Sequence, residues 1–213
     1  RGVWIEIETE SDNAIYVRID RKRKFAVTSL LRVLGAETND AIKQLFAGNE
    51  AAKVFIEASL AKDHAKTTEE SFLEIHKRMR DGEIGTVENA KEFVKGIFST
   101  DRYDLSKVGR FKFNKRFNKA LEGKDSDRRT ISLNDVVTIV NHVALLNVTP
   151  GATEDDIDHL GSRRVRYVGE MLQQKVRVGL TQMKRNIQDR MSTIDPDVSQ
   201  PLQFISPKPL QAR

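Results

Sequence analysis

The acidic run Asp155-Asp156-Ile157-Asp158-His159 is the stretch of this chain whose residue types come closest to metal chemistry. Carboxylates bind cations, but a calcium loop or a two-metal centre needs an Asp-x-Asp-x-Asp-Gly spacing that this run lacks. The histidines are scattered and form no helical ligand pair: His64, His76, His142 and His159. No phosphate-binding glycine loop, nucleophile elbow or dinucleotide fingerprint occurs. We therefore expect no catalytic residue and no metal site, and interpret the acidic run as a turn that pairs with the arginines after it.

Basic residues are gathered in three blocks. The segment 102–129 holds ten Lys and Arg against four Asp and Glu, and 163–190 holds eight against two. Arg21-Lys22-Arg23-Lys24 is a separate tetrad, whereas the net charge of the whole chain is only +5. Cations that neutralise phosphates release condensed counterions, so this clustering favours a nucleic-acid partner. A solvated helix face is the alternative for each block.

Particular residues in these blocks are candidates for nucleic-acid contacts. Lys112 and Arg116 alternate with phenylalanines, so we expect the rings in the core and the cations facing nucleic acid: Phe111, Phe113 and Phe117 against Lys112, Lys115, Arg116 and Lys119. Three arginines after the Gly161 turn point either toward phosphates or back toward the acidic run, and both interpretations stay open: Arg163, Arg164 and Arg166. Arg21 and Arg23 form either a phosphate-contacting edge or a solvated strand end.

The N-terminal residues alternate between apolar and polar types, which predicts a two-stranded hairpin. Val3, Ile5 and Ile7 form one face, and the alternation resumes after the turn-forming Ser11-Asp12-Asn13 with Ile15, Val17 and Ile19. A turn centred near Asp12 places Glu6 opposite Arg18 and Trp4 opposite Asp20. Trp4 then lies on the polar face, where burial is not the obvious outcome.

Apolar residues beyond the tetrad recur at helical spacing, so the fold class is α+β, a mostly helical domain with an N-terminal antiparallel β-hairpin. Thr28 and Thr86 are expected to cap helices, and Ser132 to do so in a capping box with Asp135. One long helix is predicted from Val168 to Met191.

We expect one domain over residues 1–192, divided into a hairpin (1–24), a mainly helical part (25–150) and a signature turn with the long helix (151–192). Four prolines in 193–213 predict an extended arm leading to the rest of a longer chain. Hydrophobic residues make up 38% of the sequence, enough for a folded, largely helical monomer. The chain has no cysteine and no run of 18 apolar residues, so we expect a soluble protein of the reducing cytoplasm, without a membrane partner.

Two stretches have compositions too unusual for simple amphipathic helices. Residues 102–114 read RYDLSKVGRFKFN, and residues 155–170 read DDIDHLGSRRVRYVGE, followed by RVGL at 177–180. Both resemble signature segments of the bacterial DNA-directed RNA polymerase β subunit. The opening Arg1-Gly2-Val3-Trp4, the VRIDRKRK of 17–24 and the LLRVLG of 30–35 are similar to the same subunit in the same order. The chain departs from the family at Ala26 and at Arg80–Gly85, where family members usually carry prolines.

The resemblance implies the lobe domain of that subunit, which forms one wall of the DNA cleft and contacts downstream DNA and the non-template strand. The tryptophan matching Trp4 stacks on an unpaired non-template base in the family, and the aspartate matching Asp20 lies beside it. The domain would be a non-catalytic part of a nucleotidyltransferase, with no cofactor of its own and with Mg²⁺ held by another subunit. Its implied partners are DNA, the α, β′ and ω subunits, σ factor and transcription factors.

Two alternatives belong to other function classes. The exposed surfaces could serve chiefly as a docking platform for transcription factors or σ on the polymerase. An independent nucleic-acid-binding protein is disfavoured by the fragment-like start and the proline-rich end of the sequence.

Overall fold

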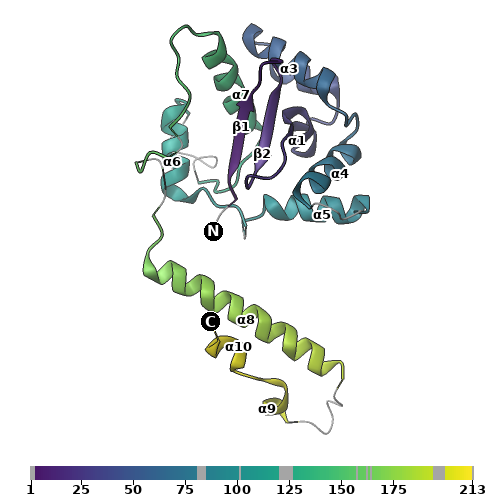
Figure 1. Cartoon of the computed structure of the whole chain (residues 1–213), viewed down its shortest axis with the longest axis vertical. Coiled ribbons are helices and arrows are strands. Elements are labelled where there is room, and N and C mark those ends of the chain that lie inside the picture. The colour runs from purple at the N-terminus through teal and green to yellow at the C-terminus, as the bar shows by residue number, and fades with distance from the viewer. Residues whose placement is uncertain are drawn as a thin grey trace. The chain divides into compact units, whose positions relative to one another are not determined.

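A computed structural model describes residues 3–80, 85–100, 102–119, 127–156, 158–161, 163, 165–193 and 200–212. The chain divides into two compact units, Arg1–Glu154 and Asp155–Arg213. Figure 1 shows strands and helices together in the first unit and helices in the second. This composition confirms the predicted α+β class. The proposed domain of 1–192 with an arm of 193–213 stays a prediction.

The first unit contains a three-stranded antiparallel sheet in the order β1-β2-β3, with β1 at Ile5–Thr9, β2 at Ile15–Ile19 and β3 at Phe25–Ala26. Glu6 pairs with Arg18 across β1 and β2, which confirms the predicted hairpin register. The two-stranded description was incomplete, because β3 pairs with β2 through Val17 and Phe25. A two-residue strand has no room for a repeating alternation, so periodicity could not reveal it.

Seven helices of the first unit lie around this sheet in the described residues (Figure 1). They are α1 (Val27–Val33), α2 (Asn39–Leu45), α3 (Glu50–Lys62), α4 (Thr68–Met79), α5 (Val87–Ile97), α6 (Ser106–Arg116) and α7 (Leu133–Val148). Helix α7 packs on β1 and on α3, α3 also contacts β2, and α1 packs on α4, which in turn contacts α5. The helices therefore bury one face of the sheet and leave its outer face for other contacts.

The core is continuous between the sheet and these helices. Ile15, Val17 and Ile19 of β2 are completely buried and belong to one cluster with residues of α1 to α5 and α7. Val3, Ile5 and Ile7 pack against this cluster and are partly buried. The predicted apolar face of the hairpin is thus the inner face.

Helix starts follow the expected capping chemistry in two of three cases. The Thr86 side chain accepts a hydrogen bond from Asn89 at the start of α5, and Ser132 and Asp135 form a capping box at α7. Thr28 does not cap α1, which begins after Ala26; its hydroxyl donates instead to the Asp63 carboxylate. The correction has a physical reason, because the buried Asp63 carboxylate needs hydrogen-bond donors and Thr28 is itself buried beside it.

Asp63 is the centre of a buried polar network that joins α1 to the segment after α3. Besides Thr28, it accepts hydrogen bonds from Ser29 (3.0 Å) and from the amide of Ala65 (3.0 Å), and it pairs with Arg32 at 2.6 Å. The Arg32 and Asp63 side chains are both essentially inaccessible to water. Breaking such a pair leaves a lone buried charge, so these groups fix α1 to the end of α3.

The second unit is organised on the long helix α8 (Val168–Met191), as predicted. Residues 200–212 are not extended as expected; they contain the one-turn helices α9 (Pro201–Phe204) and α10 (Lys208–Gln211), each with proline in its first turn. Proline lacks an N–H and presets a helical φ, so it starts a helix as readily as it ends one. Helix α10 packs against α8 at Gly179, the one described residue of α8 that is buried.

Candidate nucleic-acid interface

Trp4 lies immediately before β1 and exposes 41% of its surface. Its amide donates to Oδ1 of Asp20 at 2.9 Å, and the amide of Asp20 donates to the Trp4 carbonyl at 2.8 Å. Its neighbours Val3 and Ile5 turn inward to the core. The backbone of Trp4 is therefore fixed on both sides, while the indole lies on the outer face predicted from the alternation.

The residues after β2 form a tight turn that carries part of the basic tetrad. Asp20 and Arg21 have positive φ values of 49° and 59°, and the amide of Lys22 donates to the Ile19 carbonyl at 3.0 Å. Two successive positive φ values are typical of hairpin turns that favour Asn, Asp and Gly, so an arginine here is strained. The turn projects Arg21, Lys22 and Arg23 outward, where all three are exposed.

Lys24 is partly buried, whereas the other three cations of the tetrad are exposed. Its ammonium group pairs with Glu10 and lies 4.7 Å from the centre of the Tyr16 ring. Tyr16 in turn donates a hydrogen bond to Asp12 at 3.0 Å. Lys24 thus belongs to the hairpin, and the candidate phosphate contacts at this end of the sheet are Arg21 and Arg23.

Helix α6 carries the second set of candidates and is held in place by a buried arginine. The Arg110 side chain donates to the carbonyls of Arg128 (2.6 Å) and Thr130 (2.7 Å) and pairs with Asp135 at 3.0 Å. Lys119 reaches the other oxygen of Asp135 at 3.0 Å. Since Arg110 is almost fully buried, these bonds connect α6 rigidly to the start of α7.

The charge of Asp135 is stabilised by these partners. Burial opposes its ionisation, but hydrogen bonds from Lys119 and Ser132 and the charge of Arg110 outweigh that effect, so the pKa of Asp135 lies below its usual value. The carboxylate is therefore ionised in the folded protein at neutral pH. It neutralises the buried guanidinium of Arg110. The charge on the outer side of α6 therefore comes from its exposed lysines.

The phenylalanines of α6 do not all lie in the core. Phe113 and Phe117 are partly buried and contact each other with ring centres 4.8 Å apart, but Phe111 is 51% exposed. The expectation that Phe111 is a core residue was wrong. Arg110 takes the buried position beside it, because its carbonyl and carboxylate partners make burial of the guanidinium favourable.

The two cations of α6 proposed for nucleic acid lie in different surroundings. Lys112 is exposed on the outer side of the helix. Arg116 is exposed as well, but its guanidinium lies 3.3 Å from Nε2 of His142 and over the ring of Phe117. Arg116 thus contacts α7, and both side chains remain exposed.

Comparison with known proteins matches residues 1–166 to the family described as RNA polymerase Rpb2, domain 2. This match covers the hairpin, the turn with the tetrad, and α6. The chain belongs to this family. Two relatives are both named DNA-directed RNA polymerase subunit beta: the protein of Synechocystis sp. is 38% identical and that of Syntrophomonas wolfei is 37% identical, each over the whole chain. The chain spans 18% of the length of these two relatives.

The Rpb2 family match ends near the start of the second unit, which holds the remaining predicted arginines. Arg163 pairs with Asp158 at 2.9 Å, and Arg166 donates to Oε1 of Gln174 at 2.9 Å. Of the two predicted alternatives, Arg163 therefore follows the one in which it pairs with the acidic run. Arg164 lies outside the described residues.

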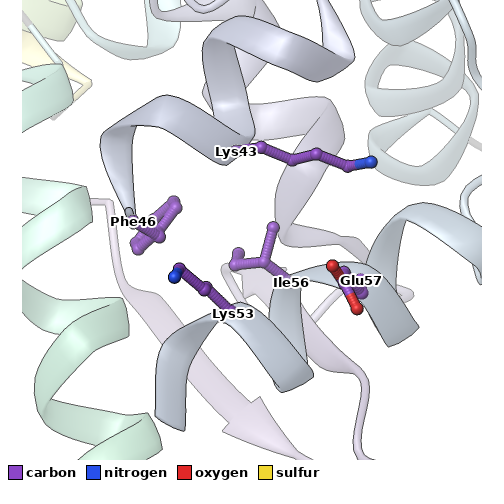
Figure 2. Close-up of a pocket in the computed structure, with 5 residues that line it drawn as sticks. All are labelled: Lys43, Phe46, Lys53, Ile56 and Glu57. Atoms are coloured by element: carbon purple, nitrogen blue, oxygen red, sulfur yellow. The ribbon is translucent and has the colours of Figure 1, made fainter. Parts of the chain in front are cut away.

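A small cavity of about 290 Å³ opens between α2 and α3 of the Rpb2-type domain. Figure 2 shows Phe46 and Ile56 with Lys43, Lys53 and Glu57 around it. Lys53 also pairs with Glu50 at 2.5 Å. The cavity has no nucleophile paired with a base, so it offers a place for an apolar side chain rather than a site for chemistry.

Neither a metal centre nor a membrane span occurs among the described parts of the chain. No group of three or more His, Cys, Asp or Glu side chains is placed to hold a metal ion. No described helix is both long and apolar enough to cross a bilayer.

Sequence reasoning placed Trp4 opposite Asp20, as the structure has them, but missed the groups that position α6. Asp135 was predicted only as part of a helix cap and Arg110 was not singled out, because their mutual contact joins residues that lie far apart in the sequence. Helical periodicity contains one indication that Arg110 faces inward. Arg110 lies three residues before Phe113, so the two side chains are on the same side of the helix.

Proposed function

We propose that this chain is the lobe domain of a bacterial DNA-directed RNA polymerase β subunit and that it forms one wall of the DNA cleft. In the assembled nucleotidyltransferase it contacts downstream DNA and the non-template strand, and it contributes no catalytic residue. The Mg²⁺ that phosphoryl transfer requires is held by another subunit. The family match over residues 1–166 and the named relatives support the assignment to this subunit.

The observation that carries the nucleic-acid role is the exposed ring of Trp4 on an immobilised backbone. An aromatic side chain that is 41% exposed and not needed in the core is suited to stack on a base. Each base offers a π-face, so such stacking tolerates any sequence and contributes about 1 to 3 kcal/mol per base. The carboxylate of Asp20 lies beside it, where it can accept hydrogen bonds from a base edge.

The basic residues named from the sequence are the candidates for phosphate contacts in each unit. Arg21 and Arg23 extend from the turn that Asp20 begins, and Lys112 and Arg116 extend from α6. Arg163, Arg164 and Arg166 of the second unit supply further positive charge. Contacts of this kind position the DNA without reading its sequence, and they weaken as salt is raised.

The second unit has the surface expected of a piece that packs against other polymerase segments. Helix α8 leaves several large apolar side chains exposed: Val168, Met171, Leu172, Val176, Val178, Leu180 and Met191. Clusters of exposed apolar residues of this extent mark protein contacts. The remaining β-subunit segments and the α, β′, ω and σ subunits are the partners that fit the proposed assembly.

The cavity between α2 and α3 favours a second role as a docking platform for transcription factors or σ. Phe46 and Ile56 are almost fully buried at its base, so an anchoring side chain of a protein partner would contact chiefly the aliphatic stems of Lys43 and Lys53. The two roles use different surfaces of the domain, so they are separable by mutation.

Replacement of Trp4 in the assembled polymerase tests the nucleic-acid role. Trp4→Ala should leave folding and nucleotide addition intact but shorten the lifetime of the open complex, because a base stack is lost on the non-template strand. Trp4→Phe should restore much of the lifetime, since phenylalanine still offers a π-face.

Promoters that lack the stacked base provide the control. With an abasic site in the non-template strand at the downstream edge of the bubble, parent and Trp4→Ala enzymes should have equal lifetimes. A Trp4→Ala defect of the same size with and without the base would refute the stacking role, as would no defect on any template.

A further inference from the structure

The outer face of α6 has an unusual composition. The helix SKVGRFKFNKR contains five cations and no carboxylate. Lys107, Phe111 and Lys115 follow one another at spacings of four residues, so they lie in one row along the helix, flanked by Val108 and Lys112. All five side chains of this set, which we call the α6 stripe, are exposed.

The two apolar side chains of the α6 stripe are too exposed to be core residues. Phe111 is 51% exposed and Val108 is 65% exposed. The inward positions of the same helix are taken by Arg110 and Asn114, which are buried, and by the partly buried Phe113. Phe111 is therefore not a core residue, and half of its surface faces solvent.

The two lysines of the row, Lys107 and Lys115, form no ion pair with any described residue. Asp135, the acid nearest to α6 in the described contacts, is engaged by Arg110 and Lys119. The same contacts hold the helix rigidly on α7. The stripe is thus a fixed positive row with an aromatic ring at its centre.

We propose that the α6 stripe is a second contact for single-stranded DNA, with Phe111 stacked on a base and with Lys107 and Lys115 on the phosphates at either side. This inference rests on the proposed function and adds a site to it that is distinct from the Trp4 turn. Single strands are bound in general by basic tracks that carry aromatic rings, since unpaired bases expose their faces. Charge complementarity selects a polyanion over a neutral protein surface, and the exposed ring selects an unpaired strand over a closed duplex.

Site-specific crosslinking in the assembled polymerase tests this. The photoreactive residue p-azidophenylalanine is placed in the full-length β subunit at position 111, at position 4, or at position 54. Val54 is the matched control, because it is an exposed apolar residue on α3 with Glu50 and Glu57 near it in sequence. Open complexes are formed on a promoter fragment with one strand labelled at a time and then irradiated.

We expect positions 4 and 111 to crosslink to the same single strand at different nucleotides, and position 54 to give no DNA product. Crosslinking at position 4 with none at position 111 overturns this inference and leaves the proposed function standing. Absence of DNA products at both positions counts against the proposed function itself. Products at 111 that contain only polypeptide overturn the inference in favour of a protein-docking surface.

The salt dependence of open-complex formation provides a second measurement. Lys107→Gln combined with Lys115→Gln should make the negative slope of log affinity against log salt less steep by about 1.4, because each phosphate contact to a single strand contributes about −0.7 to that slope. Lys77→Gln combined with Lys95→Gln removes the same charge from exposed positions on α4 and α5 and should leave the slope unchanged. Equal slopes for the two double variants overturn the inference.

Discussion

Trp4 and Asp20 are joined by two hydrogen bonds, one in each direction. The Trp4 amide donates to the Asp20 carboxylate, and the Asp20 amide donates to the Trp4 carbonyl. Asp20 is also the first of two residues with positive φ, a conformation that Asp tolerates better than most residues because its short side chain bonds locally. One carboxylate therefore orders both the turn and the strand start that presents the indole.

Replacement of Asp20 should separate the role of this acceptor from that of the charge. Asp20→Ala should lower the free energy of unfolding by about 1 to 2 kcal/mol, because it removes the acceptor of the Trp4 amide and leaves alanine at an unfavourable φ. Asp20→Asn keeps an oxygen acceptor and tolerates positive φ, so it should stay within about 0.5 kcal/mol of the parent. Urea unfolding followed by the fluorescence of Trp4, the single tryptophan, measures both. Equal losses for Ala and Asn would argue against a role for the acceptor.

Arg21 should show opposite effects on stability and on DNA binding. Arg21→Gly relieves a residue held at φ 59° and creates an Asp-Gly pair, which this turn type favours, so we expect a gain of about 0.5 to 1 kcal/mol in unfolding free energy. The same change should weaken DNA binding by the polymerase at low salt, because a cation near the phosphates is lost. Lys22→Gly is the matched control: it removes a neighbouring exposed cation where φ is not positive, and it should not stabilise the chain. A loss of stability in Arg21→Gly would contradict the strain assigned to this turn.

Asp135 should make the stability of the first unit sensitive to acid. Its pKa is lowered in the folded state, so its contribution is complete above the unfolded carboxyl pKa of about 3.9 and is lost as the pH falls through the folded value. Asp135→Asn should cost about 3 kcal/mol at pH 7, because the buried Arg110 loses its counter-charge. The variant should also have a flatter dependence of stability on pH below about 4 than the parent.

The exposed pair of Glu50 and Lys53 gives the comparison for Asp135. Glu50→Gln removes a carboxylate whose side chain is 86% exposed, so it should change the unfolding free energy by less than about 1 kcal/mol. Denaturant unfolding at pH 7, 5 and 3 compares the two variants with the parent. If Asp135→Asn is as mild as Glu50→Gln, the Arg110 network does not hold α6 in place.

Those parts of the fold that depend on local periodicity could be predicted from the sequence. The alternation of Val3, Ile5 and Ile7 placed Trp4 on the outer face, and the register opposite Asp20 followed from the position of the turn. The capping box at Ser132 and the long helix over 168–191 were also recognised from spacing alone. In each case the signal is a regular spacing of residue types along one continuous segment of the chain.

The features that were missed depend on partners distant in sequence. Phe111 was expected in the core because phenylalanine is usually buried, but Arg110 takes the inward position through contacts with residues 128–135. Thr28 was expected as a cap, and Asp63, 35 residues later, determines its hydrogen bond instead. A buried charge is stable only when all its partners are in place. These partners come from distant segments, so a local sequence pattern does not identify them.

Gly179 should prove to be the position at which the C-terminal helix is attached to α8. A Cβ atom added there would lie 3.0 Å from Leu210 Cδ2 and 3.1 Å from the carbonyl oxygen of Pro209, which is closer than side chains normally pack. Gly179→Ala should therefore displace α10 and expose residues 200–212, seen as faster amide hydrogen exchange and earlier proteolytic cleavage in that segment, although alanine alone favours a helix by about 1 kcal/mol. Gly169→Ala is the control within the same helix, because an added Cβ there meets nothing within 4 Å. It should leave exchange in 200–212 unchanged and slow exchange in α8; if both alanine variants protect the C-terminal segment equally, α10 does not depend on close contact at Gly179.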